Sequence, residues 1–200
     1  MLPLDSEYNK LLFELDKLKA LLMEINILSP KYQKAISELV LLRLFYVFEN
    51  RMIRVSYKIA SGFPYADGTT PSCLLQCTSK HDARDKMKNF NRSKTKNLKF
   101  STASEICDNL KYIVDQNEYF MTFIRYNGRV IDELRRIRNR IAHNNEGSRR
   151  EYQEVIKRYY GVKLNHITPG ILLLSNKQKP SMIEYYVSQV DVFYKLLVKK

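Results

Sequence analysis

The hydrophobic and polar positions of this chain repeat with a period typical of helices. Over residues 5–28, Leu and Ile recur three or four positions apart with Lys and Glu between them, which predicts one amphipathic helix. Ser29-Pro30 should end this helix, because proline disfavours a helical residue before it. Residues 32–60 are more continuously apolar. This pattern predicts a second helix at the centre of a bundle.

Residues 61–99 interrupt the helical pattern. Turn residues come first, at Gly62-Phe63-Pro64 and at 67–71, and residues 80–99 then hold eight Lys and Arg against two Asp. We interpret 61–99 as a basic loop insertion. It is either a solvated loop or a loop that binds phosphates, in which case Lys94 and Lys96 are candidate contacts and Phe90 could stack on a base.

The second half of the chain returns to helical periodicity. We predict helices over 101–117, 127–143 and 149–160, and a last helix beyond Pro180; Ser101 or Thr102 followed by Glu105 resembles a helix cap. Residues 162–175 contain apolar runs around Thr168-Pro169-Gly170, which predicts a small β-hairpin or two extended segments. The expected fold class is therefore all-α: a single up-and-down helical bundle over residues 1–200, with the insertion 61–99.

Composition agrees with helices and adds a direction for the function. The chain has 200 residues, of which 44% are hydrophobic, with only six Gly and six Pro. Its 34 Lys and Arg outnumber 21 Asp and Glu, giving a net charge of +13. Such a charge favours a polyanion, with nucleic acid ahead of an acidic protein or a membrane surface, although a basic chain can also be merely soluble.

Three features predict a soluble cytoplasmic protein. The longest apolar run, residues 39–48, is interrupted by Arg43 and is too short to span a bilayer. The N-terminus lacks the apolar core of a secretion signal, and the three cysteines are an odd number, which is typical of reduced thiols.

The most informative segment is Arg135-Arg136-Ile137-Arg138-Asn139-Arg140-Ile141-Ala142-His143-Asn144-Asn145. Arg138 follows Leu134 by four residues and so falls on the buried stripe of its predicted helix, where a guanidinium needs an anion or several acceptors. His143 would lie about 140° away around an unbroken helix. The two meet if the turn at Asn144-Asn145 swings the imidazole back, or if two subunits face each other across a two-fold axis.

The spacing Arg138-Asn139-x-x-x-His143 resembles the RxxxxH motif of HEPN-domain ribonucleases. The resemblance implies a compact helical bundle, a homodimer with a composite cleft, and metal-independent cleavage of RNA by its own 2′-hydroxyl. Members include toxins, abortive-infection proteins and nuclease parts of CRISPR effectors, so an antitoxin or defence partner protein is also implied. The kind of RNA, whether tRNA, mRNA or rRNA, is left open. Some HEPN toxins have Tyr two residues after the His, where this chain has Asn145.

The chemistry of RNA cleavage suits these residue types. His143 is the expected acid-base group and Arg138 the clamp for the extra phosphate charge, while Asn139 could orient His143 or bind a phosphate oxygen. No metal or cofactor is required. Neighbouring polar residues are candidate substrate contacts: Arg135, Arg140 and Asn144.

Glu49 is a polar residue inside the apolar central helix. It could pair with Arg138 and hold that side chain in place, or it could make a local ion pair with Arg51 or Arg54. We include it among the candidate substrate-site residues, and both pairings stay open at this point.

Two further hypotheses remain. Cys73, Cys77 and His81 are spaced by four, with Cys107 as a fourth ligand, so a zinc site is conceivable, but free cysteines fit the loose spacing better. Functionally, the main alternative to a ribonuclease is an inactive HEPN module that binds RNA, nucleotide or a partner protein. A purely structural helical adaptor is the third possibility.

Overall fold

The computed structural model describes residues 3–90 and 97–200, and within these ranges it contains eight helices and no strand. The helices are α1 (Asp5–Ile25), α2 (Pro30–Ala60), α3 (Lys80–Phe90), α4 (Ala103–Leu110), α5 (Tyr119–Ala142), α6 (Glu146–Tyr160), α7 (Pro169–Leu174) and α8 (Met182–Leu197). Cys73 and Val114 form an isolated antiparallel β-bridge between their backbones. The predicted all-α class is confirmed for the described residues.

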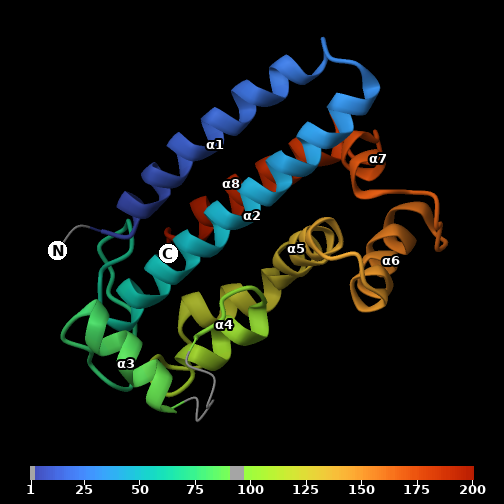
Figure 1. The fold of residues 1–200 in the computed structure, drawn as a ribbon. Coiled ribbons are helices and arrows are strands. Elements are labelled where there is room, and N and C mark those ends of the chain that lie inside the picture. Colours follow the sequence, from blue (N-terminus) through green and yellow to red (C-terminus); the bar gives the residue numbers. More distant parts are fainter. Residues whose placement is uncertain (1–2, 91–96) are drawn as a thin grey trace.

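The long helices α1, α2 and α8 run beside one another, and α5 packs against α2 and α8 (Figure 1). α2 also contacts α3, α4 and α7, so the prediction that it is the central helix is confirmed. α1 buries one stripe at three- and four-residue spacing: Leu11, Leu15, Leu18, Leu22 and Ile25. The buried apolar residues of all these helices form one hydrophobic cluster.

The first two helices lie close to their predicted ranges. α1 ends at Ile25, and α2 starts at Pro30 after Ser29, whose backbone is extended (φ −65°, ψ 152°). Proline suits this first helical position because its missing N–H has no partner within the helix anyway. The predicted end of the first helix, at residue 28, lies about one helical turn beyond its observed end at Ile25.

The predicted loop over 61–99 is wrong for residues 80–90, which form α3. Only Ala83 and Met87 of this helix are buried, and they lie four residues apart on the side facing α2 and α4. A stripe of two residues among many charges is too narrow to show as helical periodicity in the sequence. The candidate contacts Lys94 and Lys96 lie outside the described residues.

The predicted β-hairpin over 162–175 is also wrong, because residues 169–174 form α7. The Thr168 side chain accepts a hydrogen bond from the Ile171 amide, and Pro169 occupies the first turn. The Gly170 N–H donates to Glu38 Oε1 of α2 (2.8 Å). Thr-Pro-Gly is compatible with either a turn or a helix start, and packing against α2 decides for the helix.

The boundaries of α4, α5 and α6 also differ from those predicted. Thr102 caps α4 by accepting from the Glu105 amide (3.1 Å), as predicted, but α4 ends at Leu110 and not near 117. α5 begins at Tyr119 because Asn127-Gly128 continues the helix. A Cβ at Gly128 would lie 2.4 Å from the Ala103 Cβ, so this glycine allows α4 and α5 to approach closely. α6 begins at Glu146, three residues before its predicted start.

Among residues 3–90 and 97–200, no helix combines the length and the apolar character needed to cross a lipid bilayer.

Candidate functional site

Arg138 lies on α5 where this helix faces α2. Its guanidinium carbon is 5.7 Å from the centre of the Phe45 ring, and its Nη1 donates to Asn139 Oδ1 (2.9 Å). The side chain is half-buried. A ring face on one side and an amide oxygen on the other restrict the orientation of the guanidinium.

Arg138 opens into a polar hollow of about 340 Å³. Residues of α2, of the segment before α4, of α4 and of α5 line it: Phe45, Glu49, Lys99, Ser101, Glu105, Arg135, Arg138 and Asn139. Three cations and two carboxylates therefore share one depression. Such a mixture of charges can bind a phosphate while keeping an acid-base group nearby.

Glu49 shares this hollow with Arg138. Burial raises the pKa of the Glu49 carboxyl, the Arg138 charge lowers it and Glu105 raises it again, with a net result above the usual value. Of the alternative partners, Arg51 pairs with Glu7 (3.2 Å). Glu49 thus lies in the electrostatic field of Arg138, and it holds a proton more readily than an exposed glutamate.

Arg135 also lines the hollow, and its Nη2 lies 3.2 Å from Glu151 Oε2 on α6. The other flanking candidates behave differently. Arg140 Nη1 donates to Asn144 Oδ1 (2.9 Å), and neither residue is among those that line the hollow. Of the predicted substrate contacts, Glu49 and Arg135 therefore lie beside Arg138, whereas Arg140 and Asn144 form a separate pair at the end of α5.

His143 stands where α5 stops. The helix ends at Ala142, and the backbone of His143 is extended (φ −133°, ψ 117°). Its N–H donates to the Asn139 carbonyl (2.9 Å), and its own carbonyl accepts from Ser148 Oγ (2.6 Å). Its imidazole is exposed. The main chain of His143 is thus fixed between two helices, and its side chain is exposed to solvent.

The α5–α6 turn is itself built by a cap. Asn145 Oδ1 accepts from the Ser148 amide (2.8 Å), which starts α6 directly after His143. The residue at which some HEPN toxins carry Tyr therefore has a structural task in this chain.

His143 is not among the residues that line the hollow around Arg138. α5 ends at Ala142, as convergence of the two residues within one chain would require. The turn after it nevertheless leaves the imidazole outside the hollow. Asn139 does not join the two groups by its side-chain oxygen, which accepts from Arg138, although its carbonyl holds the amide of His143. Convergence across two subunits stays a prediction.

The sequence did not point to four residues of this hollow as site residues: Phe45, Lys99, Ser101 and Glu105. Phe45 and Glu49 lie four apart on α2, a spacing that places them on one face of the helix. Glu105 was expected only in a cap, and Ser101 does donate to its Oε2 through both N–H (3.1 Å) and Oγ (2.7 Å). The four-residue spacing from Glu49 could have pointed to Phe45. No sequence pattern shows that residues 99–105 approach α2.

The zinc hypothesis for Cys73, Cys77 and His81 is wrong. In the parts of the chain described, no three His, Cys, Asp or Glu side chains are gathered as a metal site would require. His81 instead pairs with Asp85 (2.8 Å). Burial raises the pKa of the Cys73 thiol to about 11 and also raises the pKa of Cys77. Both thiols therefore stay protonated at neutral pH, in agreement with free cysteines.

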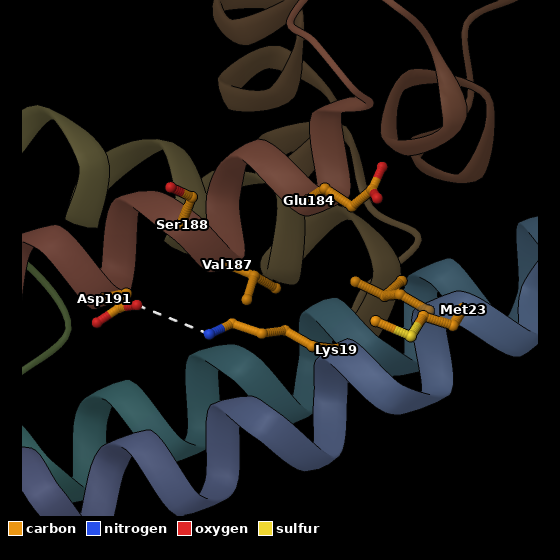
Figure 2. A pocket seen from close by; sticks show the side chains of 7 residues that line it. Lys19, Met23, Glu184, Val187, Ser188 and Asp191 are labelled. Carbon is orange, nitrogen blue, oxygen red and sulfur yellow. Dashed lines mark ion pairs between the residues drawn. The ribbon is translucent and has the colours of Figure 1, made fainter.

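Another hollow, of about 300 Å³, lies between α1 and α8. Figure 2 shows Lys19 reaching toward Asp191, with Met23 and Val187 along the same groove. Lys19 Nζ lies 3.7 Å from Asp191 Oδ2, and Asp191 Oδ1 accepts from Tyr8 (2.7 Å). Because its central charges already satisfy each other, this groove lacks the free cations that an RNA phosphate would need.

Comparisons of the chain with protein-family models, with curated protein sequences and with solved structures gave no match. The resemblance to HEPN ribonucleases therefore rests on the Arg138–His143 motif. The geometry around these two residues is the basis for the proposal that follows.

Proposed function

We propose that this protein is a metal-independent endoribonuclease of the HEPN type. One observation carries the proposal: Arg138 is held by Asn139 and Phe45 in a polar hollow, and the same helix ends five residues later at an exposed His143. In the reaction the RNA 2′-oxygen bonds to the adjacent phosphorus and the P–O5′ bond breaks. The products are a 2′,3′-cyclic phosphate and a 5′-hydroxyl, and no atom from a metal or cofactor enters this balance.

Arg138 would stabilise the negative charge that builds up on the phosphate. A guanidinium has five N–H donors, and the contact with Asn139 Oδ1 uses one of its nitrogens. The remaining donors can reach two phosphate oxygens at once, a geometry that lysine does not reproduce. Arg135 and Lys99 on the same hollow would add charge for the neighbouring phosphate.

His143 would move the protons, taking one from the attacking 2′-hydroxyl or giving one to the leaving 5′-oxygen. Histidine exchanges protons near neutral pH more readily than other side chains. Because His143 lies outside the hollow of its own chain, we propose that two copies pair about a two-fold axis. Each His143 then completes the Arg138 hollow of the other copy.

The cellular role that fits such an activity is a toxin or phage-defence effector acting on cytoplasmic RNA. The net charge of +13 favours a long-range attraction to RNA of any kind, so specificity for tRNA, mRNA or rRNA has to come from the surface around the hollow. A controlling antitoxin or defence partner belongs to this proposal. Expression should be toxic to cells, and Arg138→Ala should remove the toxicity.

The direct test is cleavage of RNA by the purified chain in EDTA, with analysis of the product ends. We expect His143→Ala and Arg138→Ala each to slow cleavage by about 10²–10⁴-fold. The matched control is His166→Ala, which removes an exposed histidine from the segment between α6 and α7 and should leave the rate unchanged. A His143→Ala protein that cuts at the wild-type rate, or a strict need for magnesium, would refute the proposal.

The shared site has its own test, in which the two inactive variants are mixed. If Arg138 and His143 act across the dimer, a mixed dimer holds one intact site and one site with both residues missing. Half of randomly mixed dimers are of this kind, so about a quarter of wild-type activity should return. If both residues act within one chain, mixing restores nothing.

A module that binds RNA without cutting it is the second candidate. The observation in its favour is the separation of His143 from the Arg138 hollow within a single chain. Wild-type protein that binds RNA through the Arg138 hollow but leaves the RNA uncut would support this candidate over the enzyme.

A further inference from the structure

Besides the Arg138 hollow and the groove between α1 and α8, a hollow of about 340 Å³ lies between α2, α3 and residues 97–100, and we call it the second hollow. Its apolar side includes Ile53 and Tyr57 of α2 and Phe100, and its polar side includes Arg84 and Lys88 of α3. Tyr57 and Phe100 meet edge to face, with ring centres 6.1 Å apart and planes at 86°. The Phe100 ring is almost fully buried and therefore fixes the half-buried Tyr57 ring in place.

The two cations of this hollow are available to a ligand. Arg84 and Lys88 lie one helical turn apart, while the two acidic residues of α3 are taken by other partners: Asp82 by Lys86 (3.0 Å) and Asp85 by His81 (2.8 Å). Within residues 3–90 and 97–200, neither Arg84 nor Lys88 has a carboxylate at ion-pair distance. Two unpaired cations beside an aromatic ring match a phosphate joined to a flat base.

The electrostatics of Tyr57 place Arg84 close to the aromatic wall. Burial raises the pKa of the Tyr57 hydroxyl, the positive charge of Arg84 lowers it and Asp85 raises it, with a net result above the usual value. The Arg84 guanidinium and the Tyr57 ring therefore line the same hollow. A base resting on Tyr57 would bring its own phosphate within reach of α3.

α2 contributes residues to both this second hollow and the Arg138 hollow. Phe45 and Glu49 line the first hollow, and Ile53 and Tyr57 line the second, each four residues after the last. Successive residues at this spacing turn by only about 40° around the helix, so all four follow one slowly winding stripe. From Glu49 to Tyr57 the helix rises about 12 Å, roughly four nucleotides at a stacked spacing of about 3.4 Å.

The segment before α4 also contributes residues to both hollows. Leu98 and Phe100 line the second hollow, whereas Lys99 and Ser101 line the first. Successive residues of this segment therefore line the two hollows in turn, so the segment lies between the hollows. A single strand of nucleic acid that occupies both hollows would run along α2 and cross this segment.

We propose that the second hollow is a nucleotide-binding subsite for single-stranded RNA, in which a base packs against Tyr57 and its phosphate is bound by Arg84 and Lys88. This inference rests on the proposed function, because it takes the Arg138 hollow as the place where the same strand is cut. The subsite selects unpaired RNA, since a base held in a double helix cannot reach the aromatic wall.

Binding is measured by fluorescence anisotropy with a short labelled 2′-O-methyl oligouridylate, which cannot undergo 2′-hydroxyl attack. We expect Arg84→Gln/Lys88→Gln to weaken binding about tenfold near 0.15 M salt and to reduce the slope of log K against log salt by about 1.4, the value for two lost phosphate contacts. The matched control is Lys195→Gln/Lys199→Gln. It removes two exposed cations at the same spacing near the end of α8 and should change the salt slope much less.

A second measurement places the base in the hollow. The chain has no Trp, so Leu98→Trp introduces a single indole beside Tyr57, and Tyr126→Trp places one at a site that is 84% exposed on α5. Bound oligouridylate should change the Leu98→Trp emission and leave that of Tyr126→Trp unchanged. Equal responses of the two indoles would overturn the subsite.

The outcomes separate this inference from the proposed function. If the Arg84/Lys88 variant binds with wild-type affinity and salt slope, or if wild type does not bind the oligonucleotide, the subsite is refuted even when His143→Ala abolishes cleavage. If wild type binds through Arg84 and Lys88 but never cuts natural RNA, the nuclease fails and the nucleotide-binding surface stands.

Discussion

Glu133 fixes α5, the helix that carries Arg138 and ends directly before His143, to the rest of the bundle. Its side chain is only 3% exposed. Oε2 accepts hydrogen bonds from the Tyr159 hydroxyl of α6 (2.8 Å) and the Tyr186 hydroxyl of α8 (3.1 Å), and Oε1 pairs with Arg158. We predict that Glu133→Ala destabilises the protein strongly, because one substitution removes the common acceptor of three donors.

The size of the effect follows from the burial of each partner. A hydrogen bond to a charged acceptor contributes about 1.5–3 kcal/mol, and the two tyrosine hydroxyls, of which that of Tyr186 is buried, would lose theirs. Arg158 is 42% exposed, so water screens its ion pair and its share is small. We expect the free energy of unfolding to fall by about 3–6 kcal/mol for Glu133→Ala, the sum for the two tyrosine hydrogen bonds. The loss for Glu133→Gln, which keeps an acceptor oxygen, is expected to be about half of that.

Urea denaturation followed by far-ultraviolet circular dichroism measures this difference, since the helices dominate the signal. The control is Glu146→Ala at the start of α6. Its ion pair with Arg150 joins side chains that are 64% and 79% exposed, so its loss should cost only about 0.5 kcal/mol. A Glu133→Ala protein as stable as this control would show that the three donors find other partners, and the reasoning from burial would be refuted.

Three further predictions concern packing, pH and the site. Gly128→Ala should lower the free energy of unfolding by about 1–3 kcal/mol, because its Cβ would lie 2.4 Å from that of Ala103; adding Ala103→Gly should recover much of the loss in the same urea assay. Burial raises the pKa of Glu7, but Lys58 (3.1 Å), Lys10 and Arg51 together outweigh burial, so the pKa lies below the ordinary glutamate value of 4.5. The stability from these ion pairs is therefore complete above that pH and lost as the pH falls through the lowered pKa, and thermal unfolding of Glu7→Gln should show a shallower acid limb than wild type. Arg138→Lys should slow RNA cleavage by at least about tenfold while RNA binding changes little, since lysine keeps the charge but not the two-pronged geometry; an unchanged rate would contradict the clamp.

Local sequence predicted the features of this fold that depend on neighbouring residues. The stripe of α1, the break between α1 and α2 at Ser29-Pro30 and the Thr102 cap of α4 are all set within a few positions, and each was predicted. The errors fall where local signals are ambiguous. α3 has a stripe of two apolar residues, and α7 begins with a Thr-Pro-Gly that also suits a turn, so contacts with α2 decide both.

In the candidate site, too, some residues could be chosen from local sequence and others only from tertiary packing. The motif residues Arg138 and His143 could be chosen from spacing and chemistry alone, because both lie in one helix and its end. Their surroundings could not: Phe45 lies 93 positions before Arg138 in the sequence, and only the packing of α2 on α5 brings them together. The exposed position of His143 outside the hollow also depends on how α5 stops and α6 starts.

What the sequence determined by itself was the helical class, the basic charge and the candidate residues for the proposed chemistry, since these follow from composition and from patterns one or two helical turns long. Only the tertiary structure decided which side chains share a hollow and which stand apart. Such neighbours come from segments far apart in the chain, and their meeting depends on the packing of whole helices, which no local pattern encodes.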